Sequence, residues 1–402
     1  MNKKILITTF SIILVIIISL GGYALYKDYR VKHAEKIVKL NRDTVNVYEE
    51  IYLKDIIKKI NGKLLENEKI NTKKVGTQEI TFDYITNKNI KVPYTIKINV
   101  VDTEPPLIKR FQRYSTYTGE KDFYKKFFCG DNYDDTPKCT VEGEYDINKP
   151  GEYNVIFKAE DSSKNKSENN FVLIVREREN TPSNNKEEKE EEPIYTNYSD
   201  IVKKYKNKNT KIGIDISQFQ GNIDFKKLKE AGVEFAYIRV GRGGGVGKEP
   251  VLDKMFEQNI KGLNKVKIPV GVYFFSYAIN EKEVKKDAKW VVKQLKNHKV
   301  DLEVAYDFED WEDYNEYNLS FYHLTNNANV FNNYMRKNGY EGMLYSSKYY
   351  LENIWFKQDY PVWLAHYTEQ TNYEGKYKVW QICENGKVDG IKSAVDIDIM
   401  YN

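Results

Sequence analysis

Four acidic residues from three separate stretches of the chain point to the chemistry this sequence is best suited for. Asp215 ends one apolar run, Asp307 and Glu309 end a second, and Asp396 lies in a third. A carboxylate inside an otherwise apolar strand is costly unless it is paired, hydrated or used. If the three stretches meet at one place, their carboxyl groups form an acidic cleft of the kind that glycosidases use.

Asp307 and Glu309 are the most informative pair. They are two positions apart, so on a strand both side chains face the same side, roughly 6.6 Å apart along the chain. Mutual repulsion and partial burial raise one pKa, so that one group stays protonated as an acid, and the longer Glu309 is the better candidate. A structural pair that binds only backbone or basic groups is the alternative. The spacing leaves retention and inversion of a sugar bond both open.

Other chemistries find little support in the composition. The four histidines, His33, His298, His323 and His366, show no HxxxH or HxH spacing, so a histidine zinc site is not expected. A GxSxG nucleophile elbow is absent from the sequence. The net charge is only +4 and no basic arm occurs, which argues against a nucleic-acid partner. We therefore expect neither a metal nor a cofactor.

The pattern after Lys211 predicts a scaffold that brings the acids together. Short apolar runs alternate with amphipathic stretches, which is typical of a parallel sheet with right-handed crossovers. Such barrels place their chemistry at the C-terminal ends of the strands. Eight strands, enough to close a barrel without its last helices, are predicted at 212–216, 235–240, 270–276, 304–308, 342–346, 362–365, 379–383 and 394–400. Helices are predicted at 224–231, 251–264, 281–297, 318–338 and after Ser347.

Short motifs occur in one order through this region. They are DISQFQGNID (215–224), GVYFFSY (271–277), YDFE (306–309), YSS (345–347), PVWLA (361–365), WQ (380–381) and GKVDGI (386–391). Taken together, they resemble glycoside hydrolase family 25, the N-acetylmuramidases. The resemblance covers essentially all of 211–402 and nothing before it, and it is the ordered set, not a single motif, that is specific.

The resemblance implies a (β/α)5β3 barrel that cleaves the β-1,4 bond between N-acetylmuramic acid and N-acetylglucosamine in peptidoglycan. Glu309 matches the general acid of the family. Asp307 matches the residue that orients and stabilises the substrate's own acetamido group, which gives net retention. Asp215 and Asp396 match two further cleft acids that hold substrate or water and tune pKa values.

Three departures from the family pattern concern substrate fit and pH profile more than reaction class. Phe274 stands where the family usually has histidine, Asp398 stands where it usually has asparagine, and the stretch 310–316 is unusually acidic. Aromatic side chains are candidates to line the sugar groove, with core packing an equal alternative, and Arg239 pairs either with a cleft acid or in a structural salt bridge. The aromatic candidates are Tyr273, Tyr306, Trp363, Tyr367 and Trp380.

The N-terminal segment predicts a membrane anchor. Residues 5–26 carry no charge and, as a helix, would span roughly 33 Å, enough to cross a bilayer. The run is long and no AxA-like site follows, which favours an uncleaved single-pass helix over a signal peptide. We expect residues 1–4 in the cytoplasm, a stalk at 27–38 and the later domains outside the cell, although lysines and arginines after the helix do not favour this orientation.

Between anchor and barrel, a repeat predicts two small β-sandwich modules, 39–103 and 104–177. GTQEITF (76–82) aligns with GEYNVIF (151–157), and each begins a hairpin of alternating polar and apolar residues. The modules and their DTEPP junction resemble immunoglobulin-like modules of bacterial surface proteins. Spacing is their expected role, with ligand binding as the alternative. Residues 178–210 are expected to form a flexible linker.

The three cysteines give weaker predictions. Cys129 and Cys139 could close a small disulfide loop in an oxidising compartment, or remain free thiols. Cys383 lies in an apolar strand pattern and is expected to be buried and inert.

The leading hypothesis is thus a membrane-tethered muramidase that opens peptidoglycan locally, as wall remodelling or assembly of an envelope-spanning machine would need. One alternative is a wall-binding protein that uses the barrel cleft as a lectin without catalysis. Another is an adhesin built on the two modules.

Overall fold

The computed structural model describes residues 3–178 and 194–402, and the side chains of the first helix from Leu14 onward. The chain divides into two compact units between Thr103 and Glu104. This division falls at the predicted boundary between the two small modules.

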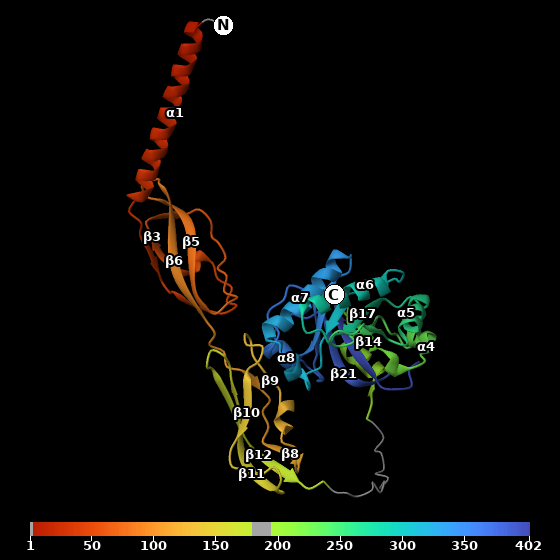
Figure 1. Ribbon diagram of the computed structural model, residues 1–402. Coiled ribbons are helices and arrows are strands. Elements are labelled where there is room, and N and C mark those ends of the chain that lie inside the picture. Colours follow the sequence, from red (N-terminus) through yellow and green to blue (C-terminus); the bar gives the residue numbers. More distant parts are fainter. Residues whose placement is uncertain (1–2, 179–193) are drawn as a thin grey trace. The chain divides into compact units, whose positions relative to one another are not determined.

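The first unit holds the N-terminal helix and a small β module (Figure 1). Its main sheet has four strands in the order β2-β6-β5-β4, and β1 pairs with β3 in a second sheet. The elements are α1 (Lys3–Lys32), β1 (Val38–Leu40), β2 (Thr44–Asn46), α2 (Leu53–Ile56), β3 (Ile57–Ile60), β4 (Gly62–Leu64), β5 (Gly76–Thr86) and β6 (Lys91–Val101).

Helix α1 covers the predicted membrane segment, 5–26, and continues into the predicted stalk. No helix formed by the described residues has the length and the apolar character that crossing a membrane requires. The side chains of residues 5–13, the first part of the predicted span, lie outside the described set.

The second unit begins with a module that repeats the central hairpin of the first. Hairpin β11–β12 pairs Gly151 with Val175, as hairpin β5–β6 pairs Gly76 with Val100, so the predicted repeat is confirmed as a pair of matching hairpins. The strand order is β10-β11-β12-β8, with β7 and β9 as a separate pair. The elements are β7 (Leu107–Ile108), β8 (Arg113–Tyr117), η1 (Phe123–Lys126), β9 (Cys129–Gly130), β10 (Lys138–Glu142), β11 (Gly151–Glu160) and β12 (Lys166–Arg176).

The predicted disulfide is present between Cys129 and Cys139, and it joins β9 to β10 in this module. Cys383 is buried as a free thiol, as predicted, and burial raises its pKa to about 11. The immunoglobulin-like character of the two modules stays a prediction.

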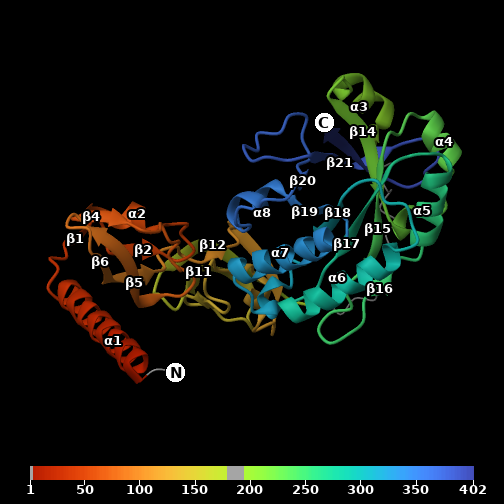
Figure 2. The same ribbon diagram turned by 90° about the horizontal axis from the view of Figure 1, so that it is seen from above.

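The rest of the second unit is a closed barrel with helices outside it (Figure 2). Six successive pairings from β14 to β21 are parallel, and β22 closes the barrel by pairing antiparallel with both β14 and β21. The barrel strands are β14 (Thr210–Ile216), β15 (Ala236–Arg242), β17 (Val270–Phe275), β18 (Val304–Asp307), β19 (Gly342–Ser347), β20 (Val362–Ala365), β21 (Val379–Lys387) and β22 (Val395–Tyr401).

One helix follows each of the first five strands, and all eight predicted strands and five predicted helices are found, which agrees with the predicted (β/α)5β3 order. The helices are α4 (Phe225–Glu230), α5 (Phe256–Lys265), α6 (Glu281–Leu295), α7 (Phe321–Lys337) and α8 (Lys348–Asn353). Smaller elements are β16 (Val251–Leu252), η2 (Gln218–Gln220) and η3 (Tyr314–Tyr317).

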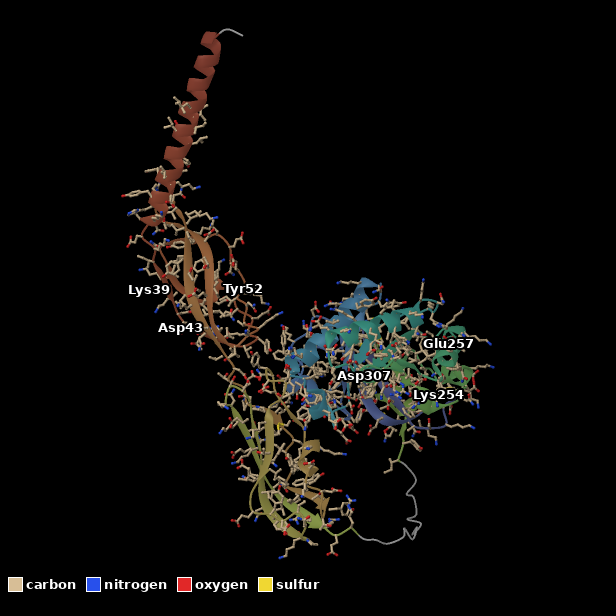
Figure 3. The ribbon with its side chains drawn as sticks, viewed as in Figure 1. Lys39, Asp43, Tyr52, Lys254, Glu257 and Asp307 are labelled. Carbon is tan, nitrogen blue, oxygen red and sulfur yellow. A yellow bond between two sulfur atoms is a disulfide. The ribbon has the colours of Figure 1, made fainter. Side chains whose placement is uncertain are left out.

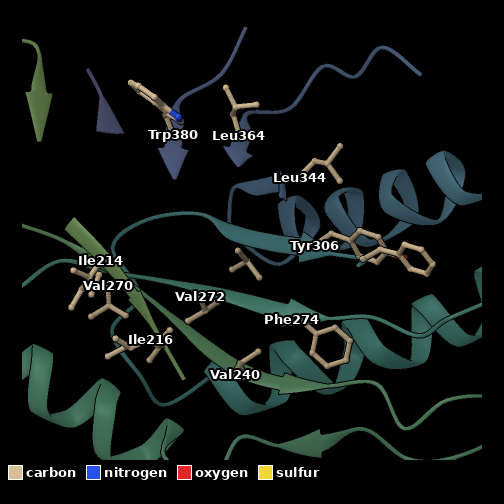
Figure 4. Close-up of a cluster of buried hydrophobic side chains, with 14 of the residues drawn as sticks. Ile214, Ile216, Val240, Val270, Val272, Phe274, Tyr306, Leu344, Leu364 and Trp380 are labelled. Carbon is tan, nitrogen blue, oxygen red and sulfur yellow. The ribbon is translucent and has the colours of Figure 1, made fainter. Parts of the chain in front are cut away.

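Alternation along the strands divides the barrel into two layers of side chains. Outward residues such as Ile214, Val272 and Leu344 pack in the layer between strands and helices (Figure 4). Inward residues such as Tyr237 and Met343 belong to a separate cluster that fills the barrel. Because successive side chains of a strand point to opposite faces, each strand supplies both layers.

The barrel begins earlier than predicted. Residues 179–193 of the predicted linker, 178–210, lie outside the described residues, but β13 (Thr196–Asn197) pairs with β21 and α3 (Tyr198–Tyr205) follows it. Tyr198 and Ile201 lie three positions apart on one face of α3 and are both buried. The Tyr198 hydroxyl donates to the carbonyl of Ile212 at 2.8 Å, which ties this helix to the first barrel strand.

The second module docks onto the barrel through β9 and the residues on both sides of it. Phe128 is buried in the barrel's core cluster, where its ring lies 5.0 Å from Tyr314 and 6.3 Å from Phe321. The Asn315 side chain accepts from the Cys129 N–H at 3.0 Å and donates to the Phe127 carbonyl at 2.7 Å. This contact joins the module to the barrel loop that follows β18.

A charged contact lies beside the buried one. The Asp135 carboxylate pairs with His323 at 2.6 Å and accepts from the Ser320 N–H at 2.7 Å, at the start of α7. The hydrogen bond from His323 is the main favourable contact that holds the pKa of Asp135 below its usual value, in spite of burial, and it raises the pKa of His323. The expected spacer role therefore does not describe this module fully, because it is built into the barrel's surface.

We predict that Phe128→Ala destabilises the barrel by about 3 kcal/mol, because it removes a buried ring and leaves a cavity. All five tryptophans lie in the barrel, so tryptophan fluorescence during urea unfolding reports on this domain. Phe219→Ala serves as the control because that ring is 71% exposed, and it should change the midpoint little. Equal midpoints for Phe128→Ala and the parent chain would show that the module does not support the barrel.

Candidate active site

The four predicted acids meet at one cavity in the barrel. Asp215, Asp307, Glu309 and Asp396 all line a hollow of about 80 Å³, together with Tyr273, Tyr345, Trp363 and Gln381. Figure 3 labels Asp307 in the interior of the barrel domain. The predicted convergence of the three acidic stretches on one place is confirmed.

The barrel's hydrogen-bond ladders position the acids. Asp215 of β14 lies directly opposite Asp396 of β22, because β22 runs antiparallel to β14 at the point where the barrel closes. Asp307 is the last residue of β18 and pairs in register with Phe275 and Tyr345 on either side. Glu309 lies two residues beyond the strand's end, but the alternation continues, because Tyr306 and Phe308 pack in the outer cluster while Asp307 and Glu309 both line the cavity.

A glutamine orients one of these acids. The Gln381 amide nitrogen donates to Asp215 Oδ2 at 2.8 Å, and its amide oxygen accepts from the hydroxyls of Tyr345 at 2.9 Å and Tyr367 at 3.0 Å. Both ends of the amide are therefore used, which fixes its orientation. The sequence motif WQ contains Gln381, but nothing in the motif indicates that this side chain supports Asp215.

Burial and mutual repulsion keep protons in this site. Loss of water raises the pKa of Asp307 well above its usual value, and the charges of Glu309 and Asp215 raise it further. The Glu309 side chain lines the cavity and is still reached by solvent, but the surrounding protein removes much of its hydration. This loss of water, together with the charge of Glu384, raises the pKa of Glu309 to about 7. A carboxyl with such a pKa can donate a proton near neutral pH.

Three carboxyl groups, two of them in the cavity wall, crowd together at the closure of the barrel. Burial is the largest cause and the charge of Asp215 the next largest, and together they raise the pKa of Asp396 to about 9. Burial and the charge of Asp398 raise the pKa of Asp215. Asp398 is fully buried and accepts from the Trp363 indole N–H at 2.8 Å, while its second oxygen has no hydrogen-bond partner among the described residues. These groups cannot all be ionised together at neutral pH.

The predicted sugar-binding aromatics divide into two groups. Tyr273 and Trp363 line the cavity, and Tyr367, which is half exposed, lies beside it through Gln381. Tyr306 and Trp380 do not line the cavity, because they point outward from their strands into the buried cluster outside the barrel (Figure 4). This corrects the prediction for these two residues.

Arg239 forms a structural salt bridge and not a pair with a cleft acid. Its Nε donates to Asp253 Oδ2 at 2.8 Å, and both side chains are largely buried. The charge of Arg239 still lowers the pKa of Asp307 against the larger upward effects. The ring of Phe219, which is not among the predicted aromatic residues, lies 4.9 Å from the Arg239 guanidinium and is exposed.

Comparison with known proteins agrees with this geometry. Residues 214–391 match the family model described as glycosyl hydrolases family 25. The C-terminal domain is thus a barrel of the family 25 type, which confirms the predicted resemblance.

Individual relatives match the same part of the chain. An autolytic lysozyme of Clostridium acetobutylicum is 25% identical over 189 residues, which cover 46% of this chain and 54% of that protein. The uncharacterized protein YegX of Escherichia coli strain K12 is 25% identical over 198 residues, 46% of this chain and 68% of that protein. The chain spans about half the length of the autolytic lysozyme that it matches.

Solved structures are similar at the level of this domain. The modular autolysin LytC of Streptococcus pneumoniae, in complex with a synthetic peptidoglycan ligand, is 29% identical with a TM-score of 0.44, covering 49% of this chain and 48% of that one. A family 25 glycosyl hydrolase of Bacillus anthracis is 20% identical with a TM-score of 0.42, covering 49% and 92%.

We predict that the barrel's stability falls as the pH rises from about 4, the ordinary aspartate value, to about 9, and that Asp398→Asn weakens this dependence. The raised pKa values mean that the folded state holds protons that the unfolded state releases, so this contribution is full at low pH and is lost as pH rises through the folded values. An asparagine keeps the oxygen that accepts from Trp363 and removes one buried group that titrates.

Melting temperatures followed by tryptophan fluorescence between pH 5 and pH 9 test this prediction. Asp389→Asn is the matched control, because it makes the same change at an exposed position near the end of the barrel. A pH dependence in Asp398→Asn as steep as in the parent chain would show that Asp398 does not take part in the coupled protonation.

Proposed function

We propose that the barrel domain hydrolyses peptidoglycan, cutting the β-1,4 bond between N-acetylmuramic acid and N-acetylglucosamine with net retention. The single observation that carries this proposal is that Asp215, Asp307, Glu309 and Asp396 line one cavity, with the pKa of Glu309 raised to about 7. The family 25 match supports the same reaction class.

In the first step, Glu309 acts as the general acid. Its proton passes to the glycosidic oxygen as the bond to the anomeric carbon breaks, so the leaving sugar departs as a neutral alcohol. The carbonyl oxygen of the substrate's own acetamido group attacks the anomeric carbon from the other face and forms a cyclic intermediate. Asp307, next to Glu309 at the cavity, orients that acetamido group. Because the two neighbouring carboxyl groups repel each other when both are ionised, we assign the proton to Glu309 and the negative charge to Asp307, which stabilises the positive charge that develops on the acetamido group.

In the second step, Glu309 is ionised and takes a proton from a water molecule. That water opens the cyclic intermediate at the anomeric carbon, and the two inversions together give retention of configuration. Asp215, held by Gln381, and Asp396 line the same cavity and hold substrate or water there. Their shared protons keep the site from accumulating charge that would oppose ionisation of Glu309.

The proposed location of the enzyme is the outer face of the cell membrane. The uncharged run at 5–26, which α1 covers, supports a single-pass anchor, and the Cys129–Cys139 disulfide suits an oxidising compartment. A tethered hydrolase would open the wall close to the membrane, where an envelope-spanning machine or wall remodelling needs a local gap.

We predict that Glu309→Gln lowers cleavage of purified peptidoglycan by about 100-fold or more, because a general acid contributes on that scale. The ectodomain should clear a peptidoglycan gel and release fragments with N-acetylmuramic acid at the reducing end, as mass spectrometry would show. Glu316→Gln is the matched control, since Glu316 is exposed in the loop after β18 and lines no part of the cavity.

Two outcomes would contradict the proposal. Equal clearing by Glu309→Gln and the parent chain would remove Glu309 from the mechanism. Binding of peptidoglycan without release of any fragment by the parent chain would favour the lectin alternative.

We further predict that the full chain remains with the membrane fraction after a high-salt wash, and that a chain lacking residues 1–26 becomes soluble. Added protease should degrade the barrel in cells whose wall has been removed, without prior lysis. Recovery of the full chain in the soluble fraction, or protection of the barrel from protease, would contradict the proposed location.

A further inference from the structure

A second, larger hollow lies where the docked module meets the barrel. It has a volume of about 900 Å³ and is lined from both sides. The module contributes Lys109, Arg110 and Lys126, and the barrel contributes Trp311, Tyr349 and Tyr350. We call this hollow the module groove.

The two walls of the module groove are held against each other. Lys126 is followed by the segment that inserts into the barrel, since Phe128 packs against Tyr314 and Trp311. On the other wall, the rings of Trp311 and Tyr350 stack with centroids 3.8 Å apart. The groove is therefore shaped by packed residues, while its three cations and Tyr349 are exposed.

The module groove begins beside the proposed general acid. Trp311 is two residues beyond Glu309, and the backbone N–H of Trp311 donates to the backbone carbonyl of Glu309 at 2.8 Å. Burial and the neighbouring Tyr349 are the larger causes that raise the pKa of Tyr350 to about 12, and the charge of Glu309 also contributes. A substrate held at the cavity thus has this groove next to it.

The charges of the module groove are unbalanced. Lys109, Arg110 and Lys126 are exposed, and none of them forms an ion pair within the described part of the chain. Glu312 is the one acidic residue among those lining the groove. Three cations against one anion favour a ligand with carboxylate groups, and the half-exposed ring of Tyr349 offers a flat surface for a sugar or peptide plane.

We propose that the module groove binds the carboxylate-bearing peptide branch of the glycan strand whose bond lies at Glu309. The module then acts as one wall of an extended substrate site, with Lys109, Arg110 and Lys126 pairing with the branch. This inference rests on the proposed function, because it takes the same polymer as its ligand.

The test compares two substrates with the full chain. One is peptidoglycan with its peptide branches, and the other is the same glycan after an amidase has removed them. In the variant Lys109→Gln/Arg110→Gln/Lys126→Gln we expect KM to rise about 10-fold on the branched polymer, because three exposed ion pairs of ordinary strength with the peptide branch are lost. On the stripped glycan, KM and kcat should stay at the parent values, and added salt should reduce the parent's preference for the branched polymer.

The variant Lys121→Gln/Lys138→Gln/Lys149→Gln is the matched control, because it removes three exposed cations of the same module that do not line the groove. Equal losses on both substrates, or the same loss in the control variant, would overturn the proposal. The proposal would also be overturned if a phosphate-bearing wall polymer, added as a competitor, inhibited the parent chain more strongly than the peptide branch does.

A binding measurement separates this proposal from the proposed function. In the Glu309→Gln background, soluble branched fragments should bind about 10-fold more weakly once the three groove cations are replaced. If no variant or parent chain cleaves either substrate, the proposed function fails, while the binding difference still decides whether the groove recognises the peptide branch. Equal binding with and without the cations would overturn the groove proposal alone.

Discussion

The site depends on keeping several carboxyl groups inside a closed barrel, close to one another and largely away from water. Asp215, Asp307 and Asp398 are all buried, and each lies near the charge of another acid. An ionised carboxylate there loses hydration and meets repulsion that little solvent screens, so the cluster keeps protons at neutral pH. A glycosidase needs this state, because one group must deliver a proton while another stays anionic.

The closure of the barrel makes this crowding possible. Strand β22 runs antiparallel between β14 and β21, and it brings Asp396 opposite Asp215 and Asp398 opposite Gln381. A further parallel strand would need a crossover connection of about a dozen residues or more at this place, whereas an antiparallel strand follows a short connection. The last three strands thus supply the part of the site that tunes and supports the acids, while β18 leads to the proposed general acid.

The second module is best understood from the segment it inserts. Phe128, Asn315 and the Asp135–His323 pair connect it to the start of α7 and to the loop between β18 and α7, the loop that contains Glu309. Packing of this kind restrains a loop that is otherwise acidic and exposed. The same contact creates the module groove, so one docking surface both supports the loop and extends the space beside the cavity.

Local pattern in the sequence predicted the strands, the helices and the positions of the acids, because alternation and amphipathicity depend on neighbouring residues alone. Strand alternation also explains the error at Tyr306, since a residue next to the inward Asp307 must face outward. Other features join residues far apart in the chain. Sequence alone did not show that Arg239 pairs with Asp253, that Gln381 holds Asp215, or that Phe128 enters the barrel core. These contacts, and the raised pKa values, exist only after folding, because distance and loss of water are properties of the packed structure.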